Sequence, residues 1–221
     1  MFEKHKVHVF IGMFGSGKTE IALNTALKLK EHNEKVAIAD VDTISPYFRT
    51  RDEKDNLESK GIEVITPPVK YMYADVPIIS PRIGGYINNP EFKTVLDVGG
   101  NDDGAIVLGS LNNFIKKADV ATYFVVNTKR PFTDTKEKII GHIKRLSAKA
   151  RVEVNYIVAN PNVMNDTTQE IVDEGEKILS EVSEEIGIPV VFTSVDERIS
   201  EKINTKYPKF LINRFMNKIW D

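Results

Sequence analysis

The sequence predicts an α/β protein, a three-layer α/β/α sandwich around a mostly parallel sheet of about seven strands. Two observations carry this prediction. Short, β-branched apolar runs alternate with stretches of helical periodicity over nearly the whole chain. These runs are apolar at almost every position, which is typical of strands covered by helices on both faces. We expect all 221 residues to form a single domain.

The strand-like runs are spaced so that a helix fits between most of them. The first covers residues 7–11 and is ended by Gly12; the others cover 36–39, 62–65, 95–98, 121–126, 155–159 and 190–192. The spacing of apolar residues predicts helices over 18–32, 104–117, 134–149, 167–186 and 198–219. Ligands of such sheets bind beyond the carboxyl ends of the strands, so the residues that follow each strand are the first candidates for a site.

The region from about 67 to 93 departs from this alternation. Residues 67–92 hold half of the chain's ten prolines, together with Tyr71, Tyr73, Tyr86 and Phe92. So many prolines exclude a long regular helix. Because aromatic residues favour packing, we expect an ordered insertion here that serves as a binding loop or a subunit contact.

Composition excludes several classes of function. The chain contains no cysteine, which excludes disulfides, thiolate metal sites and cysteine nucleophiles. Its net charge of −2 gives no basic field, so we expect neither a nucleic-acid partner nor an anionic membrane. No apolar run is long enough to cross a membrane, and the first residues lack the apolar core of a signal peptide. We therefore expect a cytoplasmic protein without membrane insertion.

The segment after the first strand matches the phosphate-binding pattern G-x-x-x-x-G-K-[ST] at every fixed position: Gly12-Met13-Phe14-Gly15-Ser16-Gly17-Lys18-Thr19. Glycines let backbone N–H groups turn toward phosphate oxygens, and the helix N-terminus adds partial positive charge there. We expect Lys18 to reach the β- and γ-phosphates and the Thr19 hydroxyl to bind Mg²⁺. A strand before the segment and a helix after it favour phosphate binding over an incidental glycine-rich turn.

An aspartate at the carboxyl end of the fourth strand is the second candidate for the metal. Asp97 follows Val95 and Leu96 and is followed by two glycines. An acidic residue there can complete the outer shell of Mg²⁺, and the glycines let a backbone N–H approach the γ-phosphate. The alternative is a turn-forming aspartate, but beside a phosphate loop we favour the metal role.

The phosphate loop, Asp40-Val41-Asp42 after the second strand, Asp97-Val98-Gly99-Gly100 and Asn160 after a late strand together resemble the SIMIBI class of P-loop NTPases. The resemblance is to the branch that includes ParA, MinD, CobQ, CobB, dethiobiotin synthetase and the nitrogenase iron protein, and it covers most of the chain. It implies the P-loop NTPase fold. It also implies that Asp40 and Asp42 help to hold Mg²⁺ and the attacking water, with Asp42 the stronger candidate. Residues 43–51 and 97–104 would then be the two switch segments.

The sequence departs from one pattern within this class. ParA and MinD carry a signature lysine after the first glycine of the loop, which reaches the partner's nucleotide across a dimer. Met13 stands at that position here. The resemblance therefore does not imply their sandwich dimer, although a homodimer of another kind stays open.

The residues that follow two later strands favour ATP over GTP. The resemblance implies that Asn160 contacts adenine. Readers of guanine in P-loop proteins usually present N/T-K-x-D, whereas residues 160–163 read Asn-Pro-Asn-Val and residues 127–130 end in Arg130. Residues 193–196 after the last strand either complete the base pocket or form only a loop and helix cap.

Two arginines in the first expected switch are candidates for stabilising charge in the transition state, as an arginine finger does. They are Arg49 and Arg51. The alternative is that they pair on an exposed turn with Asp52, Glu53 or Asp55.

We interpret the chain as an ATP- and Mg²⁺-binding ATPase that drives or switches an unidentified protein partner. The first alternative is an ATP-dependent ligase or phosphotransferase of the dethiobiotin synthetase or CobB type. Its small-molecule substrate would contact the 67–93 insertion, Arg82, Lys129 and Arg130. The second alternative is a nucleotide-sensing module that does not hydrolyse ATP.

Overall fold

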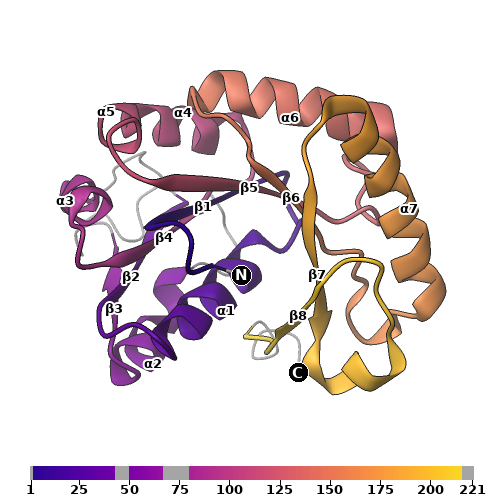
Figure 1. Cartoon of the computed structure of the whole chain (residues 1–221), viewed down its shortest axis with the longest axis horizontal. Coiled ribbons are helices and arrows are strands. Elements are labelled where there is room, and N and C mark those ends of the chain that lie inside the picture. The colour runs from indigo at the N-terminus through magenta and orange to yellow at the C-terminus, as the bar shows by residue number, and fades with distance from the viewer. Residues whose placement is uncertain (1, 43–49, 67–79, 216–221) are drawn as a thin grey trace.

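The computed structural model describes residues 2–42, 50–66 and 80–215. Within them lies one eight-stranded sheet whose neighbouring strands are all parallel, in the order β3-β2-β4-β1-β5-β6-β7-β8 (Figure 1). The strands are β1 (Val7–Ile11), β2 (Val36–Val41), β3 (Ile62–Ile65), β4 (Lys93–Val98), β5 (Val120–Val126), β6 (Tyr156–Ala159), β7 (Val190–Asp196) and β8 (Lys209–Ile212). The predicted α/β class is confirmed.

The order of the strands reverses at β1, which lies between β4 and β5. On one side of β1 lie β4, β2 and β3, with β4 inserted between β1 and β2, and on the other side the chain continues outward from β5 to β8. Such a reversal opens a crevice at the carboxyl edge of the sheet. Asp40 on β2 is in register with Asp97 on β4, and Asp97 in turn with Phe10 on β1. The fold therefore gathers the phosphate loop and both aspartate segments at the reversal point.

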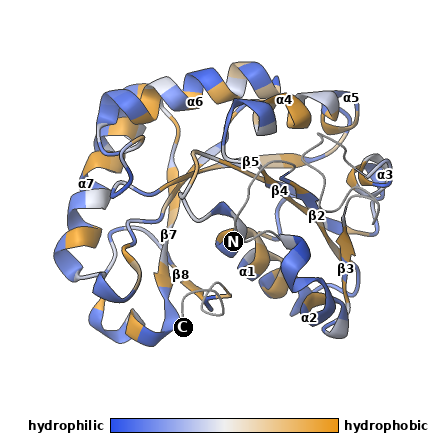
Figure 2. Cartoon of the chain, turned by 180° about the vertical axis from the view of Figure 1, so that it is seen from behind, coloured by the Kyte–Doolittle hydropathy of each residue, from blue (hydrophilic) through white to orange (hydrophobic). Residues whose placement is uncertain are grey.

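Helices cover both faces of the sheet and bury a separate apolar core on each. On one face lie α1 (Lys18–Lys30) and α2 (Lys54–Ser59); on the other lie α3 (Ile83–Asn88), α4 (Asp102–Ser110), α5 (Asn112–Ile115), α6 (Lys136–Ala150) and α7 (Gln169–Ile186) (Figure 1). The strands are mostly hydrophobic, whereas the long helices carry both hydrophobic and hydrophilic residues (Figure 2). This distribution explains why the strand runs in the sequence are continuously apolar.

The predicted helix over 198–219 is wrong for residues 198–215, and residues 216–219 lie outside the described part of the chain. A 3₁₀ helix, η4 (Glu197–Lys202), is followed by β8, which pairs with β7, so the sheet has eight strands rather than about seven. Pro208 prevents a helix from continuing through this segment. After it, Phe210 and Ile212 are buried whereas Lys209 and Leu211 are exposed, which is the two-residue period of a strand rather than that of a helix.

Two other segments refine the sequence-based elements. The predicted helix over 104–117 is divided at Leu111 into α4 and α5. In the proline-rich region, residues 67–79 lie outside the described part of the chain, and the six-residue helix α3 follows them. Gly84 of α3 packs so closely on Phe114 of α5 that a Cβ atom there would lie 2.6 Å from the ring. The expected role of the region in binding stays a prediction.

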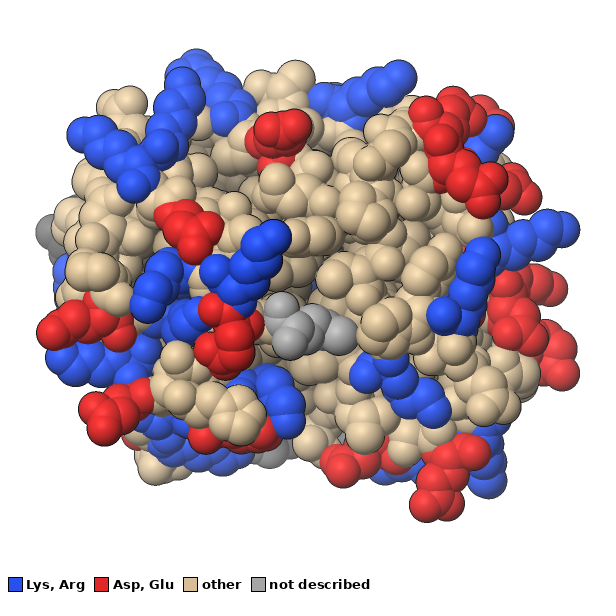
Figure 3. Space-filling model, viewed as in Figure 1, with Lys and Arg blue, Asp and Glu red and all other residues tan. Residues whose placement is uncertain are grey.

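Charges of both signs are interspersed on the face shown in Figure 3, with acidic residues gathered at its right edge, over α7. No helix among the described residues is long and apolar enough to cross a membrane.

Candidate nucleotide-binding site

The phosphate loop leaves β1 at Ile11 and enters α1 at Lys18. Its three glycines have positive φ angles, at 150° for Gly12, 74° for Gly15 and 90° for Gly17. At Gly12 a Cβ atom would lie 2.4 Å from the Val125 carbonyl oxygen, so no other residue fits this turn. No side chain caps the N-terminus of α1, which leaves its first N–H groups to an anion in the loop.

The Lys18 side chain lies folded over the loop. Its Nζ donates a hydrogen bond to the Met13 carbonyl oxygen at 3.1 Å. Burial lowers the pKa of Lys18, while the charges of Asp97 and Asp42 act in the opposite direction. A Cβ atom on Gly100 would lie 2.7 Å from Nζ, so the glycine pair after β4 leaves the space that the ammonium group occupies. The loop, β4 and β2 thus meet at one cationic group.

Asp97 is 1% exposed, and its carboxyl group lies close enough to Asp40 and Asp42 for their charges to act on it. Burial, followed by the charges of Asp40 and Asp42, raises its pKa to about 7. The Thr50 hydroxyl donates to Asp97 Oδ2 at 2.8 Å. Asp97 Oδ1 is buried without a hydrogen-bond partner among the described residues. A buried carboxylate oxygen that lacks a donor is costly unless a cation or a water meets it.

These residues fit a hard divalent cation. The unpartnered oxygen of Asp97, the nearby Asp42 carboxylate and the Thr19 hydroxyl at the start of α1 are oxygen ligands of the kind that Mg²⁺ prefers. No group of three or more acidic or histidine side chains is arranged to hold a metal among the described residues. In nucleotide sites Mg²⁺ usually takes one or two carboxylates from the protein and completes its shell with phosphate oxygens and water.

Asp40 is not open to the site. Arg51 Nε donates to Asp40 Oδ2 at 2.5 Å, and a terminal nitrogen of the same guanidinium donates to the Asp42 carbonyl oxygen at 2.6 Å. The Asp42 backbone N–H donates to Asp40 Oδ1 at 3.0 Å. Burial raises the pKa of Asp40, and the Arg51 guanidinium acts against that rise. Asp40 therefore positions Asp42, whose carboxylate was the stronger candidate for the attacking water.

The interpretation of Arg51 as part of an exposed turn is wrong, because its side chain is 5% exposed. Its Nε and one terminal nitrogen donate to Asp40 and to the Asp42 backbone, and its candidate role in the transition state stays a prediction. Arg49 and the rest of 43–49, most of the expected first switch, lie outside the described residues.

Asn160 follows β6 as predicted and lies against the phosphate loop. Its Nδ2 donates to the Ser16 carbonyl oxygen at 2.7 Å, and its Oδ1 accepts from the Ser194 hydroxyl at 2.8 Å. Gly17 makes room for this amide, since a Cβ atom there would lie 2.2 Å from Asn160 Nδ2. Asn160 thus joins the loop to the ends of β6 and β7. Its expected contact with adenine stays a prediction.

The segment after β5 also reaches the loop. Arg130 Nε donates to the Gly15 carbonyl oxygen at 3.2 Å. From the sequence Arg130 is expected as a substrate contact and as a residue that disfavours guanine reading, and no local pattern predicts its approach to Gly15 across 115 residues of sequence. Thr50 was missed for the same reason, because its contact with Asp97 depends on the fold rather than on spacing.

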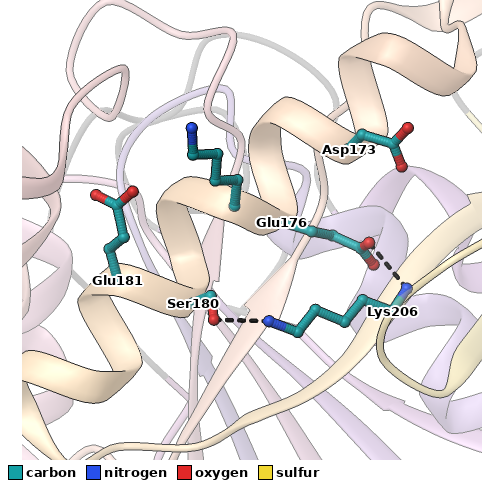
Figure 4. Close-up of a pocket in the computed structure, with 6 residues that line it drawn as sticks. Asp173, Glu176, Ser180, Glu181 and Lys206 are labelled. Carbon is teal, nitrogen blue, oxygen red and sulfur yellow. Dashed lines mark hydrogen bonds between the residues drawn. The ribbon is translucent and has the colours of Figure 1, made fainter.

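Two hollows lie near α7. One, of about 450 Å³, is lined by the segment after β5 and by α7: Thr128, Lys129, Arg130, Pro131, Asp134, Glu174 and Ile178. The other, of about 310 Å³, lies between α7 and Lys206 (Figure 4). There the Glu176 carboxylate accepts from the Lys206 backbone N–H at 2.9 Å and from the Thr193 hydroxyl, which fixes the approach to β8. The second hollow is therefore a structural feature apart from the phosphate loop.

No protein-family model and no curated protein sequence matches the chain. Solved structures do. FtsY from Mycoplasma mycoides superposes with a TM-score of 0.59 at 18% identity, over 89% of this chain and 62% of that one. Cell division protein FtsY from Thermotoga maritima gives 0.58 at 18% identity, over 88% and 63%. Signal recognition particle receptor FtsY from Elizabethkingia anophelis, in complex with GDP, gives 0.54 at 18% identity, over 89% and 59%.

The chain spans about three fifths of the length of these structures. At such identities the likeness concerns the fold alone. These neighbours belong to the SIMIBI class of P-loop NTPases, which the sequence motifs resemble. The chain therefore has the fold of that class.

Proposed function

We propose that this protein is a Mg²⁺-dependent P-loop nucleoside triphosphatase that acts as a nucleotide-dependent switch for another molecule. One observation carries the proposal. Lys18, folded onto the carbonyl oxygen of its own phosphate loop, lies beside a buried aspartate that has an unpartnered oxygen, where the strand order reverses. Such an arrangement provides a cation, backbone N–H donors and metal ligands at one point, which is what phosphoryl transfer requires.

In this mechanism Lys18 leaves the Met13 carbonyl and binds the β- and γ-phosphate oxygens, while the N–H groups of the loop surround the β-phosphate. When bound, Mg²⁺ would neutralise part of the negative charge of the phosphates. Asp42 accepts a hydrogen bond from the water and orients it for in-line attack. The water oxygen bonds to the γ-phosphorus as the bond to the bridging oxygen breaks, and the diphosphate leaves with that electron pair. The proton of the water ends on the released phosphate.

The nucleotide we propose is ATP. Residues 160–163 lack the aspartate of the guanine-reading pattern, and Val163 stands at its place. GTP is the second candidate, because one FtsY structure of the same fold contains GDP. Asn160 does not decide between them, since both ends of its amide are engaged inside the protein.

We further propose that the chain works as one domain, because a single sheet runs through the described residues. The residues that contact the γ-phosphate would communicate the nucleotide state to the partner. That partner is a protein, a small molecule or a second copy of the chain. The ligase and the non-hydrolysing sensor remain the alternatives that the following experiment separates.

The test is phosphate release from Mg·ATP and Mg·GTP by the wild-type chain and three variants. We expect Lys18→Ala to abolish turnover and Asp42→Asn to slow it while sparing binding. Lys28→Ala is the matched control, because it removes an exposed lysine from the same helix, paired only with Glu31 among the described residues. Turnover that is unchanged in Asp42→Asn would remove this residue from the mechanism. Binding without release would favour the sensor, and release that requires a metabolite would favour the ligase.

A further inference from the structure

An arginine outside the predicted motifs lies against the phosphate loop with its charge unneutralised by any described carboxylate. Arg130 covers Gly15, and its Nε lies 3.4 Å from the position that a Cβ atom would take there. Its one hydrogen bond to the loop is to the Gly15 carbonyl oxygen, a neutral acceptor. The side chain is exposed, so a ligand in the loop can reach it.

The neighbouring acidic residues are already paired. Glu174 and Asp134 line the 450 Å³ hollow with Arg130. Glu174 pairs with Lys129 at 2.5 Å, and Asp134 pairs with Lys138 at 2.7 Å. Among the described residues Arg130 therefore has no ion-pair partner, which distinguishes it from Arg51.

The backbone that carries Arg130 is fixed at several points. Its N–H donates to the Asn127 carbonyl oxygen at 3.1 Å, and its own carbonyl accepts from the Thr133 N–H at 2.9 Å. The Thr133 hydroxyl also donates to the Asn127 carbonyl, and Asn127 Nδ2 donates to the Asn162 carbonyl. A turn held in this way presents the guanidinium with little loss of backbone entropy on binding.

We propose that Arg130 is the phosphate-contacting arginine of this site, provided by the chain itself. In the absence of nucleotide the guanidinium rests on the Gly15 carbonyl; when a triphosphate occupies the loop, it exchanges that contact for charged phosphate oxygens. Such a charge-assisted, bidentate contact is much stronger than one to a carbonyl. The contact includes a γ-phosphate oxygen, so a nucleoside diphosphate lacks it, and it stabilises the negative charge on the phosphoryl group in the transition state. The inference rests on the proposed function.

The test compares Arg130→Ala and Arg130→Lys with the wild-type chain. Lys136→Ala is the matched control, since it removes a cation at the start of α6 that pairs with Glu185 instead of the loop. The readouts are kcat and the ratio of the Kd for the nucleoside diphosphate to the Kd for its β,γ-imido triphosphate. We expect Arg130→Ala to lower kcat at least ~100-fold and the Kd ratio about 10-fold. Arg130→Lys should retain part of both, and millimolar guanidinium should restore part of the lost turnover in Arg130→Ala.

A kcat for Arg130→Ala within about threefold of wild type would overturn the proposal. So would equal losses of diphosphate and triphosphate affinity, because these would show a brace for the loop rather than a phosphate contact. If the wild-type chain binds nucleotide without turnover, the Kd ratio alone decides. If it binds no nucleotide at all, the proposed function itself fails, which is a separate and recognisable result.

Discussion

Replacement of Asp97 by asparagine should stabilise the protein in the absence of metal. The Asp97 carboxyl has a pKa of about 7 in the fold against 3.8 as the ordinary value, chiefly because it is buried. In the folded state it therefore binds a proton between these pH values that the unfolded chain releases, and the free energy of unfolding falls as pH rises through this window. The pKa difference of about 3 units, at 1.36 kcal/mol per unit, lowers the free energy of unfolding by ~4 kcal/mol by pH 8.

Asparagine removes the charge and retains an oxygen that can accept the Thr50 hydroxyl bond. Urea unfolding without Mg²⁺, between pH 5 and 8, measures the effect. The wild-type free energy of unfolding should fall by up to about 1.4 kcal/mol per pH unit relative to Asp97→Asn. The variant should also lose the stabilisation that Mg²⁺ with nucleotide gives the wild-type chain. Asp55→Asn, at an exposed position, is the control. Parallel pH profiles for Asp97→Asn and wild type would refute the reasoning.

Three further predictions concern residues around the site. His8 is buried, and burial lowers its pKa to about 3. The free energy of unfolding should therefore be at its full value above pH 6.5 and fall below it, by ~2 kcal/mol at pH 5. In urea unfolding, His8→Gln should not show this decrease at low pH. Asn160→Ala should lower the free energy of unfolding by about 1–3 kcal/mol, because the Ser16 carbonyl loses its hydrogen-bond donor. In calorimetric titrations the variant should bind ATP and GTP more weakly by the same factor. A loss of affinity for ATP alone would establish that Asn160 reads the base. Arg51→Met should lower the free energy of unfolding by about 3–5 kcal/mol, because the buried Asp40 carboxylate loses its ion-pair partner. The double variant with Asp40→Asn should recover most of this stability in thermal unfolding. Absence of recovery would contradict the ion pair.

The sequence predicts most of the fold because its signals are local. A strand covered on both faces is apolar along its whole length, and the phosphate loop needs glycines and a lysine at fixed spacing, so both can be recognised without any contact map. Asp97 could be placed because a parallel sheet brings the carboxyl ends of its strands to one edge.

The remainder depends on contacts between distant residues. Arg51 has polar neighbours in sequence that suit a surface turn, and only the fold brings it to Asp40 on β2. Arg130 meets Gly15 because β5 lies next to β1. The last strand was mistaken for a helix because lysines and apolar residues near the C-terminus fit both periods over so short a segment.

The most direct test of the central claim is calorimetric titration of ATP and GTP into the wild-type chain and Lys18→Ala, with and without Mg²⁺. The account predicts that the wild-type chain binds a triphosphate, that Mg²⁺ strengthens this binding, and that Lys18→Ala loses it. Absence of binding in the wild-type chain, or equal binding in Lys18→Ala, would contradict the assignment of the loop as a phosphate site.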